Sequence, residues 1–308
     1  MAIRWDVTGR CPLRCKYCKI WKMKFRELDT RTIFRIIDEL AAVGVKKISF
    51  SGGEPLLRED ICAIIKQAKD KGISPELNSS GFCFSAKAAG LGALDLLKLS
   101  LDGPEEIHDV VREIKGSHKW VMDAARFAQE KRIKFIFCTT LTGYNIAHIE
   151  YMLKVAREFG TRVRFQPFKN VRYLKDNTDG FDREIIFSKS QLKNGLDLLK
   201  KECRSKNSVI DNSLWSLEHI RSWPKYQHLK CWAGKAFCMI NPEGDISPCD
   251  RLFYKGKLPN CAERSFQEAF RELPVLPSCP GCGFLGALTL NYLMNFKVDF
   301  KLLKKIIN

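Results

Sequence analysis

The sequence has no long apolar run, and its first residues, "MAIRWDVTGR", contain no apolar stretch of the kind that marks a secretory signal. A membrane-spanning helix needs about 20 consecutive apolar residues, and a signal peptide needs an apolar segment of roughly 7 to 15 residues. We therefore expect a soluble, cytoplasmic protein. With 308 residues, of which 45% are hydrophobic, the chain is long enough for one large core and a smaller second domain.

Acidic residues are scarce: 35 Asp and Glu stand against 52 Lys and Arg, which gives a formal net charge of +17. Such an excess points to an anionic partner or substrate, such as a phosphorylated metabolite, a lipid head group or a nucleic acid, although a solvated basic surface explains it equally well. The sequence contains no zinc-finger spacing, aromatic RNA-binding motif or helix-turn-helix signal. A nucleic-acid partner is therefore not expected.

Cysteine, by contrast, is abundant. The chain has 13 cysteines, a high number for a compartment in which thiols stay reduced and disulfides are rare. Clustered spacing favours metal ligation. Four cysteines stand alone in the sequence, and we interpret them as small, buried apolar residues: Cys62, Cys83, Cys138 and Cys203. The others form two groups, one near the amino terminus and one beyond residue 230.

Up to residue 166, short β-like runs alternate with amphipathic helical segments. Two helical patterns, at 30–44 and 58–72, end at a glycine, which is a typical helix stop signal. Repeated β/α units predict an α/β fold with a parallel sheet, curled into a full or partial barrel over residues 1–170. The predicted strands are 3–7, 46–51, 74–78, 96–101, 133–140 and 162–166.

The remaining chain divides into three parts. Residues 171–225 form a polar and helical linker, and residues 226–285 a small, turn-rich domain with six cysteines. In residues 286–308, apolar and basic residues alternate in short groups, which predicts an amphipathic terminal helix. That helix either caps the barrel or makes a peripheral contact with a membrane surface or a partner.

Unusual motifs follow each predicted strand of the barrel. Three cysteines come after the first strand and "SGGEPL" after the second, and polar loops follow the other four at 78–81, 100–104, 139–145 and 166–170. In β/α barrels, catalytic groups lie on the loops at the carboxyl ends of the strands. The sequence therefore predicts a functional site at that end of the barrel.

The first cysteine group consists of Cys11, Cys15 and Cys18, with no fourth Cys or His nearby. Zinc sites usually have four protein ligands. A [4Fe–4S] cluster held by three thiolates, in contrast, keeps one iron open for an external ligand. An iron–sulfur cluster is therefore the better interpretation.

This spacing, Cys-x3-Cys-x2-Cys with an aromatic at Tyr17, resembles the signature of the radical S-adenosylmethionine (radical SAM) superfamily. The sequence Gly52-Gly53-Glu54-Pro55 after the second strand is similar to the "GGE" motif of that family. The resemblance implies a partial (β/α)6 barrel in which S-adenosylmethionine chelates the open iron. Backbone groups of this motif and Glu54 would then contact the methionine amino group. Reductive cleavage of the cofactor would give a 5′-deoxyadenosyl radical that abstracts hydrogen from a substrate C–H bond.

The resemblance extends to the segments "SLDGP" and "HDVVR". It implies that Ser100 contacts the cofactor ribose and that Arg112 contacts the methionine carboxylate. Asp102 belongs to the same segment, but with the following glycine it is also a common turn former. Asn78 and Thr140 lie where further polar contacts to the cofactor are expected, although polar residues are ordinary at strand ends.

The second cysteine group begins with Cys231 and Cys249 and ends with Cys279 and Cys282 in "CPGC". The turn signal "NPEG" at 241–244 predicts a hairpin that brings Cys231 toward Cys249. The segment resembles the auxiliary-cluster domain called SPASM, or its shortened twitch form. No cysteine follows Cys282, so the resemblance implies one auxiliary [4Fe–4S] cluster held by these four thiolates, with a role in electron transfer. A structural zinc ion is the alternative.

Cys238 and Cys261 lie within this group and have no assigned partner. Either could replace one of the four ligands. Either could instead donate a hydrogen atom to a substrate radical, or be a buried residue without a chemical role.

The resemblance leaves the net reaction open: oxidation, epimerisation or bond formation on a small molecule, sugar, lipid head group or peptide. It implies a flavodoxin- or ferredoxin-like reductant. We expect no peptide-recognition segment before the barrel, which makes a peptide substrate less favoured but leaves open a separate recognition partner. The basic stretch "KIWKMKFR" at 19–26 favours an anionic substrate. An iron–sulfur electron carrier and a zinc-binding adaptor are the alternatives without catalysis. The intact motif at 52–55 argues against a carrier, which needs no cofactor clamp.

Overall fold

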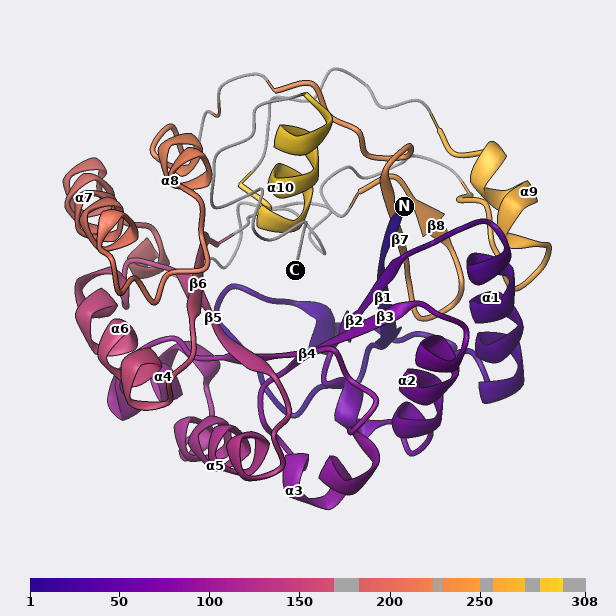
Figure 1. The fold of residues 1–308 in the computed structure, drawn as a ribbon, viewed down its shortest axis with the longest axis horizontal. Coiled ribbons are helices and arrows are strands. Elements are labelled where there is room, and N and C mark those ends of the chain that lie inside the picture. Colours follow the sequence, from indigo (N-terminus) through magenta and orange to yellow (C-terminus); the bar gives the residue numbers. More distant parts are fainter. Residues whose placement is uncertain (169–182, 224–225, 227–228, 250–256, 275–282, 296–308) are drawn as a thin grey trace.

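The computed structural model describes residues 1–168, 183–223, 226, 229–249, 257–274 and 283–295 (Figure 1). Cys279, Cys282 and residues 296–308 of the predicted terminal helix lie outside the described residues. Within the described ranges, no helix has the length and apolar character that crossing a bilayer requires.

The predicted partial barrel is confirmed. All six predicted strands are present, each pairs in parallel with its sequence neighbour, and the helices between them lie outside the curved sheet (Figure 1). The sheet follows the order β6-β5-β4-β3-β2-β1-β7-β8. The barrel strands are β1 Ala2–Thr8, β2 Lys47–Gly52, β3 Ser74–Ser79, β4 Leu96–Ser100, β5 Phe135–Leu141 and β6 Val163–Pro167.

Each barrel strand has one apolar and one polar side. Trp5, Phe50 and Phe137 are completely buried in the core between sheet and helices. Apart from Ile136, which precedes Phe137, their neighbours along the strands are polar or charged. Because successive side chains alternate, these neighbours face the inside of the barrel. This inner face is formed by Arg4, Asp6, Ser49, Glu76, Asn78, Lys98, Ser100, Cys138, Thr140, Arg164 and Gln166.

The helices of the barrel form where the sequence places an apolar stripe and a cap. In α1, four buried apolar side chains recur along one stripe, and the Asp29 carboxylate caps the first turn by accepting a hydrogen bond from Thr32 N at 2.8 Å. The helix is followed by Gly44 at φ +77°, as its sequence predicts. The barrel helices are α1 Thr30–Ala42, α2 Ile61–Asp70, α3 Phe84–Lys87, α4 Glu105–Arg112, α5 Ser117–Glu130 and α6 Ile149–Glu158.

The predicted hairpin of the cysteine-rich segment is present as β7 Phe237–Ile240 and β8 Ile246–Ser247. Its turn is held by the Asn241 side chain, which accepts hydrogen bonds from Glu243 N and Asp245 N, both at 2.9 Å. The sequence did not reveal that β7 pairs in parallel with β1, in the register Ala2 with Phe237. This pairing satisfies backbone groups that β1 would otherwise expose at a sheet edge.

The remaining helices flank this extended sheet. The short helix α9 packs on α1, where Glu39 accepts a hydrogen bond from Phe266 N at 2.6 Å. The helix α10 packs on α8 through the Tyr292 hydroxyl, which donates to the Trp215 carbonyl at 3.3 Å. These helices are α7 Lys189–Arg204, α8 Leu214–Ile220, α9 Phe266–Arg271 and α10 Leu285–Met294. Short 3-10 turns are η1 Ile20–Lys22, η2 Pro55–Leu57, η3 Ala88–Gly90, η4 Ile146–His148 and η5 Arg183–Ile185.

Charged residues on the inner face are paired. Lys98 and Glu76 are both nearly buried and form an ion pair, and Lys98 also donates to the Ser49 hydroxyl at 3.2 Å. Lys47 binds the other oxygen of Glu76 at 2.7 Å. Burial alone would raise the pKa of Glu76, but the two ammonium groups outweigh it and lower the pKa to about 2.

We predict that Glu76→Gln lowers the free energy of unfolding by about 3–5 kcal/mol at neutral pH, because it leaves the Lys98 ammonium buried without its counter-charge. Since the pKa of Glu76 is lower in the folded chain, its contribution is present above the ordinary carboxyl pKa and lost as pH falls through about 2. Urea unfolding at several pH values should show that the difference between wild type and variant shrinks in acid.

The control is Glu59→Gln, which removes an exposed carboxylate. It should change the free energy of unfolding by less than about 0.5 kcal/mol. Equal stabilities of Glu76→Gln and wild type at neutral pH would contradict the buried ion pair.

Candidate functional site

The loop that carries the first three cysteines is fixed to the loop after β2 by backbone hydrogen bonds. Gly53 N donates to Thr8 O and Glu54 N donates to Arg10 O, both at 2.8 Å. Cys11 follows directly. The two motifs that the sequence analysis singled out, on adjacent strands, are therefore in direct contact.

Only glycine allows this contact. Gly52 has φ +122°, a conformation that residues with a Cβ rarely adopt. A Cβ on Gly53 would lie 2.0 Å from the Arg10 carbonyl oxygen, well inside van der Waals contact. The glycines are therefore required by the close approach of the two loops.

The side chain of Glu54 joins the same loop to the end of β3. Its carboxylate is buried and accepts hydrogen bonds from Ser80 N at 2.7 Å, from the Ser80 hydroxyl at 2.6 Å and from the Ser79 hydroxyl at 3.0 Å. Burial raises the pKa of Glu54, and these hydrogen bonds oppose that effect. Sequence reasoning missed both serines, although they lie in the loop at 78–81 that it identified.

The three thiols share one tight loop, in which Cys18 N donates to Cys15 O at 2.9 Å. Cys15 is buried, whereas Cys11 and Cys18 are partly exposed. Burial is the main cause that raises the pKa of Cys11 and of Cys15 to about 12. The Leu13 backbone opposes this effect at Cys11 and the Arg112 charge opposes it at Cys15, whereas the neighbouring thiols add to it. In the described ranges, no group of three or more His, Cys, Asp or Glu side chains is already arranged as a metal-binding site.

These thiols nevertheless have the chemistry of cluster ligands. With pKa values of about 12, Cys11 and Cys15 stay protonated at neutral pH unless a bound cation offsets the burial. The Arg112 guanidinium, 3.8 Å from Cys15 Sγ, is placed to donate a hydrogen bond to a metal-bound thiolate. The loop therefore fits an iron–sulfur cluster held by three cysteines.

A buried carboxylate, Asp102, organises the neighbouring loops. It accepts hydrogen bonds from the Tyr17 hydroxyl at 2.9 Å and from Thr140 N at 2.8 Å. Arg112 binds it through two nitrogens, at 2.8 and 2.7 Å, and lies over the Tyr17 ring at 5.5 Å. Asp102 thus connects the cysteine loop, β4, β5 and α4.

His108 supports this network and was missed in the sequence. Its Nδ1 accepts a hydrogen bond from Asp102 N at 3.1 Å. Burial, together with the nearby Arg112 charge, holds the pKa of His108 well below its usual range, so the ring is neutral and able to accept. The only sequence signal for His108 was its position in the segment "HDVVR", in which we had predicted a role for the arginine alone.

The other predicted cofactor contacts lie at the same end of the barrel. The Asn78 side chain donates to Ser49 Oγ and Phe50 O, both at 3.0 Å, and so braces β2 against β3. Thr140 meets Asp102 through its backbone, and Ser100 ends β4 on the inner face. The expected contacts of Asn78, Ser100, Arg112 and Thr140 with a cofactor remain predictions.

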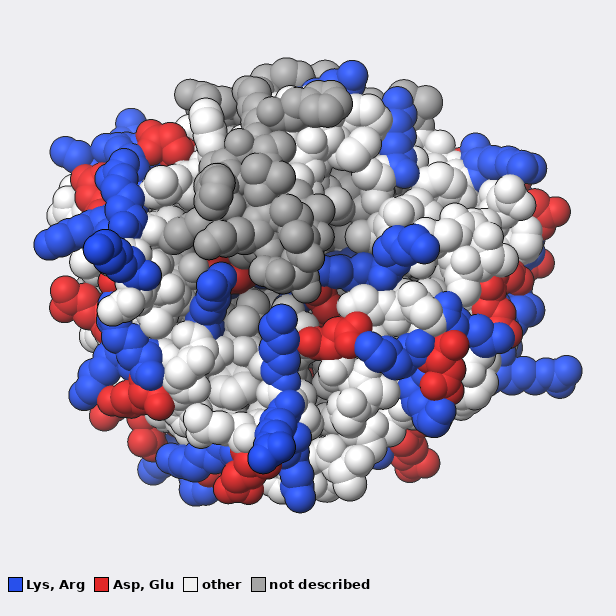
Figure 2. Space-filling view, viewed as in Figure 1, with Lys and Arg blue, Asp and Glu red and all other residues white. Residues whose placement is uncertain are grey.

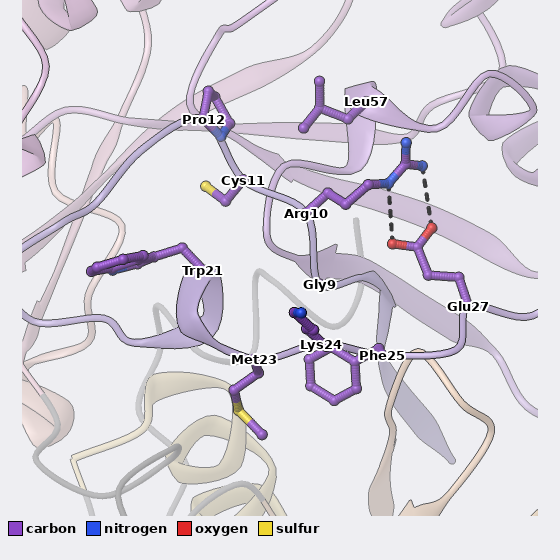
Figure 3. Close-up of a pocket in the computed structure, with 10 residues that line it drawn as sticks. All are labelled: Gly9, Arg10, Cys11, Pro12, Trp21, Met23, Lys24, Phe25, Glu27 and Leu57. Carbon is purple, nitrogen blue, oxygen red and sulfur yellow. Dashed lines mark hydrogen bonds and ion pairs between the residues drawn. The ribbon is translucent and has the colours of Figure 1, made fainter.

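A cavity of about 560 Å³ adjoins Cys11 (Figure 3). Figure 3 shows Trp21, Lys24 and Phe25 on one side of it and Cys11 and Leu57 on the other. Nearly all of its wall comes from the two limbs of a single loop, residues 9–27.

Two members of the second cysteine group lie in the described residues. Cys231 and Cys249 pack against the same small apolar cluster of Ala233, Phe237 and Ala287. The approach of the two thiols to each other remains a prediction, and Cys279 and Cys282 lie outside the described residues.

Two polar groups beside Cys231 suit a metal-bound thiolate. The buried Asn291 side chain of α10 donates to Cys231 Sγ at 3.5 Å and accepts a hydrogen bond from Trp232 N at 2.9 Å. The indole nitrogen of Trp232 is buried without a hydrogen-bond partner among the described residues. Donors aimed at or near a sulfur ligand are typical of iron–sulfur sites, so these residues fit an auxiliary cluster. Asn291 lies in the predicted terminal helix, where nothing in the sequence indicated this contact.

Cys238 and Cys261 are completely buried in the main hydrophobic core. Cys238 pairs in register with Ile3, on the side of the sheet that faces the helices, and Cys261 Sγ donates to Gly244 O at 3.1 Å. Burial raises the pKa of both thiols, that of Cys261 to about 12. These positions favour the interpretation of both as residues without a chemical role.

The four isolated cysteines differ from the uniform burial that we expected. Only Cys203 is buried; Cys62 and Cys138 are partly exposed and Cys83 is exposed. Cys83 stands in a left-handed turn after β3, at φ +55°, and Cys138 faces the inside of the barrel beside Arg164. The expectation was wrong because the burial of a side chain depends on strand register and turn geometry. An isolated cysteine in the sequence indicates neither of these.

Comparison with known proteins agrees with this geometry. Residues 5–156 match the family model described as the Radical SAM superfamily. An AdoMet-dependent heme synthase of Methanosarcina barkeri is 26% identical over 291 residues, which cover 88% of this chain and 81% of the relative. A PqqA peptide cyclase of Ruegeria pomeroyi is 34% identical over 164 residues, which cover 51% of this chain and 44% of the relative.

Among solved structures, SuiB of Streptococcus suis bound to S-adenosylmethionine has a TM-score of 0.73 and 15% sequence identity. The match covers 89% of this chain and 66% of SuiB. The likeness shows a common fold, and the match spans less than two thirds of both SuiB and the peptide cyclase.

We predict that Gly53→Ala destabilises the chain by about 1–3 kcal/mol, because the new methyl group overlaps the Arg10 carbonyl and must push the cysteine loop away. Urea unfolding measures the loss, and iron content after anaerobic reconstitution reports the displaced loop. Gly92→Ala is the matched control, since a Cβ there meets no atom within 4 Å. Equal stability and equal iron content in the two variants would contradict the close approach.

We predict that Asp102→Asn lowers the free energy of unfolding by about 3–5 kcal/mol, since it leaves the buried Arg112 charge uncompensated. Asp123→Asn is the control: its carboxylate pairs with Lys119 and Arg126 on the surface, where ion pairs contribute about 0–1 kcal/mol. Urea unfolding of both variants measures the difference. Losses of similar size would mean that Asp102 does not hold the site together.

Proposed function

We propose that this chain, whose residues 5–156 belong to the Radical SAM superfamily, is an enzyme that abstracts a hydrogen atom from a C–H bond of an organic substrate. The cofactors of this family are a [4Fe–4S] cluster and S-adenosylmethionine. When bound, they supply a 5′-deoxyadenosyl radical through one-electron cleavage of the sulfonium.

One observation carries the proposal. The loop of Gly52–Pro55 is bonded through Gly53 N and Glu54 N to the backbone immediately before Cys11. A structural metal site has no need for a second glycine-rich loop held against the ligand loop. A site that must hold both a cluster and a small cofactor on its open iron does need one.

The roles of the chain's own residues follow from their contacts. Cys11, Cys15 and Cys18 hold the cluster, with Arg112 beside Cys15 Sγ. Asp102 keeps the Tyr17 ring and Arg112 in place, and so fixes the orientation of the cysteine loop relative to β4 and β5. Fixed positions of this kind matter because a carbon radical reacts with whatever lies nearest.

The cysteine-rich segment holds one auxiliary [4Fe–4S] cluster in this proposal, with Cys231, Cys249, Cys279 and Cys282 as its ligands. The apolar cluster that Cys231 and Cys249 share and the amide donor of Asn291 support it. Four protein ligands leave no open iron, so the auxiliary cluster passes electrons and does not bind the substrate.

The substrate lies against the polar inner face of the barrel in this proposal. The side chains of Lys98 and Arg164 project there from adjacent parts of the sheet, each paired with a carboxylate. Such a surface suits a polar substrate with anionic groups, and the relative named PqqA peptide cyclase suggests a peptide as one example. Whether the product is oxidised, epimerised or cross-linked depends on the substrate.

The test is anaerobic reconstitution of the full chain and of two variants, Cys15→Ala and Cys231→Ala, followed by iron analysis and measurement of 5′-deoxyadenosine after reduction with S-adenosylmethionine present. The wild type should hold about eight irons and form 5′-deoxyadenosine. Cys15→Ala should hold about four irons and form none, because the open iron is lost. Cys231→Ala should lose the auxiliary iron and still cleave the cofactor slowly.

The outcomes separate the alternatives. A wild-type chain that holds iron but never forms 5′-deoxyadenosine would be an electron carrier. A colourless chain that holds zinc would be an adaptor without catalysis. Loss of all iron in Cys15→Ala would contradict two independent sites.

A further inference from the structure

The loop that carries Cys11, Cys15 and Cys18 has an unusual charge. Cationic side chains cover much of the face shown in Figure 2, and in most places acidic ones lie between them. Residues 10–26, which we call the basic loop, contain no acidic residue at all. The loop contains Arg10, Arg14, Lys16, Lys19, Lys22, Lys24 and Arg26.

The exposed part of the basic loop combines charge with apolar surface. The Trp21 ring lies between two cations, with Arg14 5.5 Å and Lys22 5.0 Å from its centre. Met23, beside it, is 39% exposed. Lys24 is exposed and forms no ion pair within the described part of the chain. An aromatic residue ringed by cations is typical of surfaces that bind acidic partners.

The cavity of about 560 Å³ beside Cys11 opens within this loop. Its wall consists of residues 9–12, 21, 23–25 and 27 together with Leu57, and it includes no side chain of the inner face. A molecule seated here therefore comes close to a cluster ligand without entering the barrel. That position does not suit a substrate, whose C–H bond must face the inside of the barrel.

The position does suit a source of electrons. The proposed function consumes one electron for each cofactor cleavage, and this electron must reach the cluster from outside the chain. We propose that the basic loop, with Trp21 and Met23 at its centre, is the docking surface of an acidic one-electron carrier protein. The proposal rests on the proposed function, because without a reducible cluster there is nothing to reduce.

Charge complementarity singles out this occupant. The basic loop has seven cations within 17 residues, of which Arg10 and Lys16 form ion pairs with Glu27 and Glu113. The excess of positive charge that remains attracts an acidic surface from a distance and steers its approach, as in other electrostatically guided complexes. Complexes for electron transfer are small and short-lived, with interfaces below about 1,200 Å². The half-buried Trp21, with exposed Met23 beside it and cations close to its ring, provides an interface of that kind. The electron leaves the reduced carrier and enters the cluster held by the three cysteines, and no proton or bond changes at the surface.

The experiment compares the reconstituted wild type with the double variant Lys22→Glu/Lys24→Glu. Stopped-flow absorbance follows reduction of the iron–sulfur chromophore without S-adenosylmethionine, by a reduced acidic flavodoxin or by reduced methyl viologen, a small cation. We expect the variant to be reduced at least about tenfold more slowly by flavodoxin at low salt, and no more slowly by methyl viologen. The wild-type rate with flavodoxin should fall steeply as salt is raised, and the variant rate should not.

The matched control is Lys201→Glu/Arg204→Glu, which makes the same change in net charge at exposed positions of α7. It should retain the wild-type rate with flavodoxin. Equal slowing in both double variants would overturn the proposal, since net charge alone would then explain the effect. So would a wild-type rate in Lys22→Glu/Lys24→Glu, or an equal slowing with methyl viologen. A wild-type chain with no reducible cluster would overturn the proposed function as well, and iron analysis distinguishes that failure from the others.

Discussion

The site depends on one buried carboxylate. Asp102 belongs to the end of β4, yet its oxygens bind the cysteine loop through Tyr17, α4 through Arg112 and β5 through the backbone of Thr140. Asp102 and Arg112 are both buried, so the Arg112 charge cannot exchange Asp102 for water. The neutral His108 ring accepts a hydrogen bond from the Asp102 backbone N–H and so fixes the position of this backbone. The cysteine loop, the region of β4 and α4, and β5 therefore keep one arrangement around Cys15.

The barrel and the location of its site could be predicted from the sequence, because strand periodicity and the position of the cysteines are local properties. Gly52 and Gly53 could likewise be recognised in the sequence as part of a motif. The roles of Ser80 and Asn291 could not be predicted, because each depends on a hydrogen bond to a residue many positions away. The role of His108 could not be predicted either, because its partner is the backbone N–H of Asp102 in a loop whose geometry the sequence does not show. Serine, histidine and asparagine are common enough that only the fold gives them a partner.

Arg112 shows how a motif can place a residue correctly and still leave its partner open. Its position in "HDVVR" led us to expect a contact with the cofactor carboxylate. The structure puts its guanidinium on Asp102 and beside Cys15 Sγ, where it also lies over Tyr17. A guanidinium has five N–H donors, so binding to Asp102 does not use them all. Asp102 offsets the cost of burying the Arg112 charge whether or not Arg112 also binds a cofactor carboxylate. The Asp102–Arg112 ion pair is therefore the lasting contact of the site.

The pairing of β7 with β1 relates the two cysteine groups to each other. Ala2, at the start of β1, packs in the apolar cluster that receives Cys231 and Cys249, whereas Thr8, at its end, precedes the first cysteine loop. Seven residues of a strand span about 20 Å, so Ala2 and Thr8 lie near opposite ends of the inner face. Arg4 reaches over the Phe284 ring between them, at 5.7 Å, and joins the inner face to the start of α10. A substrate on the inner face would therefore have the first cysteine loop at one end and the cysteine-rich segment at the other.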